Sequence, residues 1–117
     1  MPAAFVSDPA RRVEIARMIL SQLPEWFGIP AATEGYITDA AHEPCFVCEK
    51  DGAPVGFLCL KETGRSTVEL AVMGVLKPCH RKGYGRALVD AAVAYARQTG
   101  YEFMQVKTVQ MGKYEEY

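Results

Sequence analysis

The chain has 117 residues, half of them hydrophobic, and a formal net charge of -1. This length suits one domain with one core, so we expect a single domain over residues 1–117. The near-zero charge excludes a general attraction to nucleic acid or to an acidic membrane surface. The sequence also lacks an apolar signal segment and a run of about 18 apolar residues, which predicts a cytoplasmic protein with no membrane partner.

The first predicted helix follows Asp8-Pro9, a capping residue before a proline that suits the first helical position. Residues 31–40 predict a second, short helix. Between the two helices, Trp26 and Phe27 make the connection unusually aromatic. Two interpretations of this pair stay open: it fills the core, or it lines a pocket and binds the substrate.

The next segment has the pattern of β-strands. Residues 46–49 and 55–60 predict a hairpin around Asp51-Gly52, because this dipeptide readily adopts the positive φ angles of a tight turn. A turn at residues 63–66 leads into a third strand over residues 67–75. That strand is almost wholly apolar, which is typical of a central strand covered on both faces.

The chain has four cysteines: Cys45, Cys48, Cys59 and Cys79. Cys45 and Cys48 are three residues apart in a predicted strand, so their side chains point to opposite faces. No second paired spacing completes a zinc site. We therefore expect no metal and four buried, reduced thiols.

Residues 79–89, CHRKGYGRALV, combine basic side chains with two glycines. A helix follows as far as Gly100, and a last strand covers residues 102–109. A strand, a helix and a strand in this order predict a βαβ unit with parallel strands and a right-handed crossover. The sequence thus predicts an α/β (α+β) fold, with antiparallel N-terminal strands, a βαβ unit and helices on both faces of a mixed sheet.

The basic loop lies between a strand and a helix, a position that suits a phosphate. Backbone N–H groups at a helix start have no helical partner, and the helix dipole adds positive potential. Gly83 and Gly85 allow an anion to approach the backbone closely. A P-loop would need Lys-Ser or Lys-Thr after its last glycine, and a dinucleotide fingerprint would need a third glycine in place of Leu88.

The segment His80-Arg81-Lys82-Gly83-Tyr84-Gly85 resembles the acetyl-coenzyme A loop of the GNAT acyltransferases. That loop has Gln or Arg, two residues, Gly, one residue, and then Gly or Ala. Residues 69–75, ELAVMGV, look like the strand that precedes it in the family, and the order of elements is similar along nearly the whole chain. Two positions differ, since His80 replaces the usual Gln or Arg and Pro78 falls one residue late.

The resemblance implies an N-acetyltransferase that moves an acetyl group from acetyl-CoA to a primary amine of a small molecule or peptide. It implies that the pantetheine arm pairs with Met73 and Val75, and that the Met73 N–H stabilises the oxyanion. The resemblance also implies a bulge that opens the sheet there, and we expect it at Gly74. The residues that it implies for the pyrophosphate are His80, Arg81, Lys82, Gly83, Tyr84, Gly85 and Arg86.

Glu69 is the candidate general base. A lysine-type amine has a pKa of about 10.4, so it must lose a proton before it attacks a thioester. Similar family members have a glutamate at this position. The other open interpretation is that Glu69 lies at a solvent-facing strand end and has a structural role only.

Compared with the family pattern, the chain ends at residues 112–117, where a helix that carries the general-acid tyrosine would begin. We therefore expect the family's C-terminal helix and strands to be missing, and we assign no general acid. Two function classes stay open: an active N-acetyltransferase, or a catalytically incomplete GNAT-like module that binds CoA or a protein partner. An uncovered last strand over residues 102–109 predicts a homo-oligomer through this edge or through the Lys113–Tyr117 tail.

Overall fold

The computed structural model describes residues 3–25 and 27–105. No helix in this described part is long and apolar enough to cross a membrane. The elements in chain order are β1 (Ala4–Val6), α1 (Pro9–Leu20), α2 (Pro30–Asp39), the 3-10 helix η1 (Ala40–His42), β2 (Cys45–Lys50), β3 (Ala53–Gly64), β4 (Thr67–Val75), the 3-10 helix η2 (Lys77–Cys79), α3 (Tyr84–Gln98) and β5 (Phe103–Gln105).

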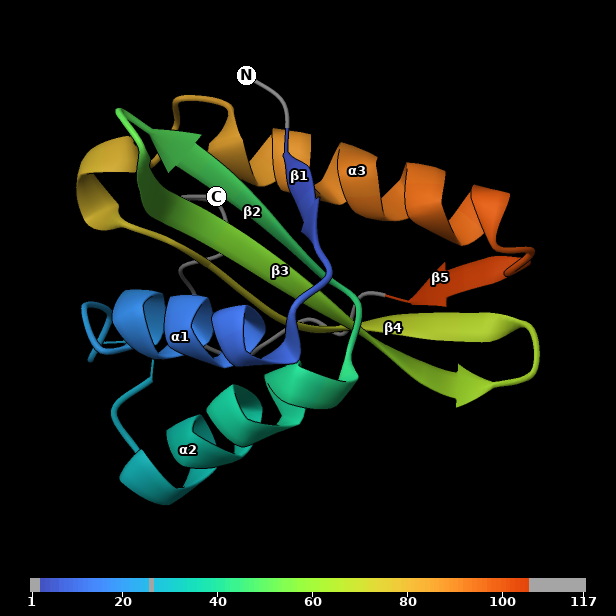
Figure 1. The fold of residues 1–117 in the computed structure, drawn as a ribbon, viewed down its shortest axis with the longest axis horizontal. Helices are drawn as coiled ribbons and strands as arrows, with labels where there is room; N and C mark the ends of the chain where they lie inside the picture. The colour runs from blue at the N-terminus through green and yellow to red at the C-terminus, as the bar shows by residue number, and fades with distance from the viewer. Residues whose placement is uncertain (1–2, 26, 106–117) are drawn as a thin grey trace.

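The strands form one mixed sheet in the order β1-β2-β3-β4-β5. Neighbouring strands are antiparallel, except that β5 runs parallel to β4. Helices α1 and α2 cover one face and α3 covers the other (Figure 1). The core therefore has two layers, one around Ile19 of α1 and Phe57 of β3, the other around Leu88 of α3 and Leu58 of β3. The predicted fold class is confirmed.

Helix α1 begins where the sequence predicts it. The Asp8 carboxylate accepts a hydrogen bond of 3.1 Å from the Ala10 N–H, and Pro9 occupies the first turn. Helix α2 begins at Pro30 and also confirms the prediction. Strand β1 was not predicted, because three residues are too few to display an alternating pattern; it pairs Phe5 with Phe46 of β2.

The predicted hairpin between β2 and β3 is confirmed. Asp51 and Gly52 have φ angles of 55° and 81°, as a tight turn with two positive φ angles requires. The strand β4 follows from the second predicted turn, and the βαβ unit from β4 through α3 to β5 is parallel as expected. The predicted last strand continues to residue 109, but its residues 106–109 lie outside the described part.

The bulge in β4 is at Ala71 and not at Gly74, which corrects the sequence-based expectation. Cys59 of β3 is opposite Val72, and the next residue, Leu60, is opposite Leu70, so Ala71 is the extra residue. The insertion moves Leu70 and Val72 to opposite faces of the sheet, toward α3 and α1 respectively.

Gly74 is required by packing instead. It pairs regularly with Phe57. A Cβ at this position would lie 3.1 Å from Leu23 Cδ1 and 3.3 Å from Ile19 Cγ2. The glycine therefore allows α1 and the segment after it to pack closely on β4.

Two of the four cysteines form a disulfide, which corrects the expectation that all are reduced. Cys45 of β2 and Cys59 of β3 are direct partners in the sheet, with their Cα atoms 4.3 Å apart, and their sulfurs are bonded. The sequence does not reveal this pair because it depends on strand register. Cys48 and Cys79 are free and buried, as predicted.

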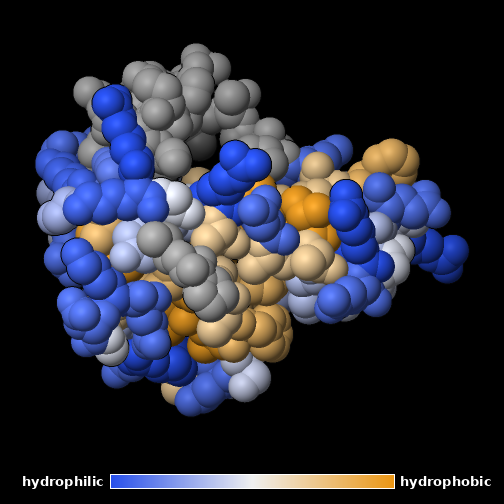
Figure 2. Space-filling view, turned by 90° about the horizontal axis from the view of Figure 1, so that it is seen from above, coloured by the Kyte–Doolittle hydropathy of each residue, from blue (hydrophilic) through white to orange (hydrophobic). Residues whose placement is uncertain are grey.

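The face of the molecule that carries β1 exposes an apolar area. In Figure 2, viewed from that end, hydrophobic residues gather in the middle of the face and hydrophilic residues surround them. Phe5 of β1 is one of the exposed large hydrophobic residues, with 49 % of its surface exposed while its ring stacks on Tyr95 and meets Phe46 edge-on.

Candidate functional site

Strand β4 presents backbone groups on the side away from β3. Leu76 donates its N–H to the Val55 carbonyl of β3 at 2.8 Å. Because backbone groups alternate in direction along a strand, the N–H and C=O of Val75 and Met73 point to the opposite side. Within the described residues, β5 pairs only with Thr67–Glu69. Met73 thus offers its N–H and C=O, and Val75 its N–H, beyond the last described pair with β5.

The loop after β4 is fastened to the end of that strand. The imidazole Nε2 of His80 lies 2.6 Å from the Val75 carbonyl oxygen. A carbonyl only accepts hydrogen bonds, so this nitrogen carries the proton. Its bond to Val75 directs the Nε2 of His80 to the strand, whereas the resemblance implies that His80 contacts an anion.

The loop reaches α3 through two residues with left-handed backbone. Arg81 has a φ of 62°, and Gly83, the N-cap of α3, has a φ of 89°. The first bond of the helix joins the Ala87 N–H to the Gly83 carbonyl at 3.0 Å. The N–H groups of Tyr84, Gly85 and Arg86 precede it and have no helical partner. They form the anion cradle that the sequence predicts.

Open space lies in front of this cradle. A Cβ built on Gly83 meets no heavy atom within 4 Å outside its immediate neighbours. Arg81, Lys82 and Arg86 are exposed around it, whereas Tyr84 and Gly85 are buried. Such a set of backbone donors and exposed cations fits a pyrophosphate.

Lys77 and Glu25 hold the loop from its other end. Their side chains form an ion pair that joins η2 to the segment after α1. Within the part of the chain that the structure describes, this pair and the bond of His80 to β4 both attach the basic loop.

A scan against protein-family models matches residues 6–113 to the acetyltransferase (GNAT) family. The chain belongs to this family. The GNAT acetyltransferase described here has no significant match in a search of curated proteins.

Solved structures with the same fold include several acetyltransferases. A ribosomal-protein-alanine N-acetyltransferase from Brucella melitensis biovar Abortus 2308 is 14% identical, with a TM-score of 0.74 over 95% of this chain and 82% of that chain. An IAA acetyltransferase from Bacillus cereus is 18% identical, with a TM-score of 0.73 over 97% and 70%. The aminoglycoside N-acetyltransferase AAC(6')-Iy, bound to a bisubstrate analogue of CoA and acetylneamine, is 20% identical, with a TM-score of 0.71 over 98% and 85%. At these identities the likeness shows the fold.

Glu69 lies in the middle of the sheet of the acetyltransferase. It pairs with Lys61 of β3 and with Gln105 of β5, and its side chain is half-buried. Four residues separate it from Met73, which corresponds to about 10–13 Å along a strand. A glutamate side chain does not cover this distance, so a proton from an amine at Met73 would reach Glu69 only through water.

Phe27 packs as a core residue. It is half-buried against the α1 side of the core, and its ring meets that of Tyr36 edge-on with the centroids 6.1 Å apart. These contacts favour the core-filling interpretation. Trp26 lies outside the described residues, so its contact with the substrate stays a prediction.

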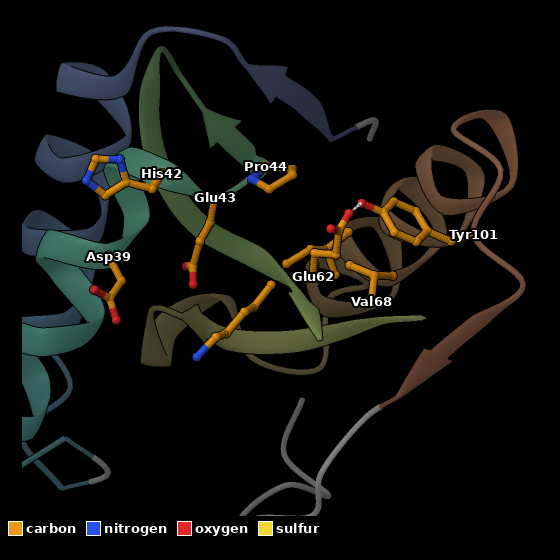
Figure 3. A pocket seen from close by; sticks show the side chains of 9 residues that line it. Asp39, His42, Glu43, Pro44, Glu62, Val68 and Tyr101 are labelled. Atoms are coloured by element: carbon orange, nitrogen blue, oxygen red, sulfur yellow. Dashed lines mark hydrogen bonds between the residues drawn. The ribbon is translucent and has the colours of Figure 1, made fainter. Parts of the chain in front are cut away.

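A second candidate site, a hollow of about 480 Å³ with mostly polar lining residues, lies between η1 and the C-terminal half of β3. Sequence reasoning missed it, since no motif marks its residues. They are Asp39, His42, Glu43, Pro44, Leu60, Lys61, Glu62, Val68 and Tyr101 (Figure 3).

The carboxyl groups in the hollow have different surroundings. Burial, with a further contribution from the charge of Asp39, raises the pKa of Glu43 from 4.5 to about 7, while Lys61 opposes the change. The Tyr101 hydroxyl donates a hydrogen bond to Glu62, and this bond raises the pKa of Tyr101 to about 12. The Tyr101 hydroxyl therefore keeps its proton at neutral pH.

Proposed function

We propose that this GNAT acetyltransferase transfers an acetyl group from acetyl-CoA to a primary amine of a small molecule or peptide. The observation that carries the proposal is the continuity of β4, the basic loop and α3. The outward backbone groups of Met73 and the outward N–H of Val75 lie at the end of β4, and the loop that follows ends at the free N–H groups of residues 84–86. One extended ligand with a pyrophosphate at one end and an amide-bearing arm at the other suits this path.

In the proposed reaction, acetyl-CoA supplies an acyl carbon that an amine can attack. The N–H groups of residues 84–86, with Arg81, Lys82 and Arg86, bind the pyrophosphate and fix the register of the thioester. The Met73 N–H stabilises the negative charge that develops on the acyl oxygen. The C–N bond forms as the C–S bond breaks. Glu69 accepts a proton from the amine through water, and a general acid, to which we assign no residue, protonates the leaving CoA thiolate.

A glycine variant tests the cofactor site. Gly83→Val should weaken CoA binding at least tenfold in a calorimetric titration, because its side chain enters the open space in front of the N–H groups. Gly52→Val is the matched control: its φ is 81°, and a Cβ there also meets no heavy atom within 4 Å, but it lies in the β2–β3 turn. Unchanged CoA affinity in a folded Gly83→Val protein would refute the site.

Acetyl-CoA with a panel of amines tests turnover. Amine-dependent release of the CoA thiol identifies an enzyme. CoA binding without thiol release for any amine would instead support the catalytically incomplete module. The Phe27 and Trp26 segment remains a proposed acceptor contact, which Phe27→Ala tests through the KM for the amine.

We also propose that the protein acts in the cytoplasm and associates through its C-terminal edge strand. In the described sheet β5 has a neighbour on one side only, and 60 % of the surface of Phe103 is exposed. The Lys113–Tyr117 tail, which the same proposal includes, lies outside the described residues. Light scattering over a dilution series tests the association, and a persistent monomer would exclude it.

A further inference from the structure

The carboxylate of Glu43 is buried, and the described part of the chain gives it no hydrogen-bond or ion-pair partner. Only 9 % of the residue is exposed. Among the described residues, no hydrogen bond or ion pair reaches its side chain, although the backbone on both sides is well anchored. The Glu43 N–H bonds the Ala40 carbonyl at 3.3 Å, and the next carbonyl, that of Pro44, accepts from the Leu60 N–H at 2.9 Å. The described residues thus anchor the backbone at Glu43 but leave its carboxylate without a partner among them.

Glu43 points into the polar hollow. In Figure 3 its side chain extends from the ribbon into the space between Asp39 and Glu62. A volume of about 480 Å³ is large enough for a small organic ligand. A buried polar group without a partner is costly, and such groups in native proteins commonly meet a ligand or water.

The charges that face Glu43 favour a cation. Asp39 comes from α2, and Lys61 and Glu62 from β3, with His42 in η1. The three carboxyl groups outnumber the one lysine. Tyr101 already donates to Glu62. Glu43 and Asp39 are therefore the acceptors that an incoming donor would meet, and an ammonium group offers three N–H donors and a positive charge.

The hollow lies at a fixed distance from the proposed reaction centre. Cys45 of β2, Cys59 of β3 and Val72 of β4 form a row across the sheet. Glu43 precedes Cys45 by two residues, so continuing the register places it opposite Lys61 of β3, whose partner in β4 is Glu69. Met73 is four residues further along β4, on the order of 10–13 Å away. A single amino group cannot contact Glu43 and also attack an acyl carbon held at Met73.

We propose that the hollow binds a second ammonium group of a di- or polyamine acceptor, with Glu43 as its counter-ion. The inference rests on the proposed function, since it assumes that the first amine is acetylated near Met73. It adds a substrate class to that function: acceptors with two cationic groups separated by a flexible or extended spacer.

The test compares 1,8-diaminooctane with n-octylamine, which has the same chain but one amine. In calorimetric titrations without CoA, the wild-type protein should bind the diamine at least tenfold more tightly, as a charge-assisted hydrogen bond of about 1.5–3 kcal/mol predicts. Glu43→Gln should remove this preference. Glu49→Gln, an exposed glutamate at the other end of β2, is the matched control and should keep it.

Lys61→Met provides an independent variant, because it removes the ammonium that competes for Glu43. It should strengthen diamine binding several-fold. Equal binding of the two amines by the wild-type protein, or a preference that persists in Glu43→Gln, would overturn the inference.

The two proposals fail in different ways. If diamine binding depends on Glu43 but acetyl-CoA gives no thiol release, the proposed function fails and the cation site stands. If n-octylamine is acetylated but Glu43→Gln leaves the preference between the two amines unaltered, the cation site fails and the acetyltransfer stands.

Discussion

The Nε2 atom of His80 and the carbonyl oxygen of Val75 are 2.6 Å apart, so a side chain of the basic loop is bonded to the last residue of β4. Val75 is almost fully buried. The bond therefore connects the proposed anion cradle to the part of the strand proposed to hold the thioester.

Replacing His80 should loosen this connection. His80→Ala leaves the buried Val75 carbonyl without its donor, so the free energy of unfolding should fall by about 1–3 kcal/mol. Urea denaturation measures the change. Lys82→Ala, an exposed residue two positions along the loop, is the control and should change stability little. Equal stability of His80→Ala and Lys82→Ala would contradict the structural role of the bond.

Gly74→Ala should destabilise the protein by about 1–3 kcal/mol, because the added methyl group enters a filled space. The nearest atoms are Leu23 Cδ1 at 3.1 Å and Ile19 Cγ2 at 3.3 Å. Gly64→Ala is the control, since its Cβ would be 3.9 Å from that of Thr67. The urea denaturation midpoints of the two variants measure the difference in stability. A Gly74→Ala protein as stable as wild type would contradict the prediction, because it would show that α1 moves to admit the methyl group without loss of stability.

Glu69→Gln should lower the amine-dependent rate by about a hundredfold, the smaller end of the range for a general base, while CoA affinity stays the same. The glutamine retains the size of the side chain but cannot take the proton. Steady-state rates at saturating amine, measured from acidic to basic pH, test this. Glu102→Gln, at an exposed position before β5, should behave as wild type. An unaltered rate for Glu69→Gln at every pH would assign Glu69 a structural role.

Thiol titration of the unfolded protein should find two reactive cysteines without reductant and four after reduction. The disulfide joins Cys45 and Cys59, which are 14 residues apart, and leaves Cys48 and Cys79 as thiols. Burial raises the pKa of the Cys48 thiol, which also makes it slow to react in the folded state. Reduction should cost about 2–4 kcal/mol of stability. Four reactive thiols without reductant would exclude the bond.

Glu43 should make stability depend on pH in an unusual direction. Its pKa rises from 4.5, the unperturbed value expected in the unfolded chain, to about 7 in the folded protein, so the folded state binds the proton more tightly. Below about pH 4.5 the group is protonated in both states and has no effect. As the pH rises toward 7, the unfolded state is favoured progressively, and well above pH 7 the full penalty of about 3 kcal/mol applies.

Glu43→Gln removes this penalty. The variant should therefore gain stability over wild type at pH 8 and show little difference at pH 4 in urea denaturation. Glu49→Gln, which is exposed, should show no such pH-dependent gain. A gain that is the same at both pH values would mean that packing, and not ionisation, distinguishes Glu43 from glutamine.

Local signals in the sequence determined most of the fold. Asp8-Pro9 specified the start of α1, Asp51-Gly52 specified the first hairpin turn, and the change from strand to helix periodicity specified the βαβ unit. The sequence also predicted the anion cradle of the basic loop, because the glycine spacing at residues 83–85 and the helix start that follows are neighbours in the chain. Each of these features depends on residues within a few positions of one another.

The tertiary structure decided the features that depend on strand register. Cys45 meets Cys59, and the bulge falls at Ala71, because β2, β3 and β4 align in one particular way. The role of Gly74 likewise depends on where α1 packs. Glu43 is an ordinary glutamate in the sequence. Its burial and raised pKa arise only when residues from α2, η1 and β3 enclose it, since desolvation is a property of the surrounding volume and not of the chain.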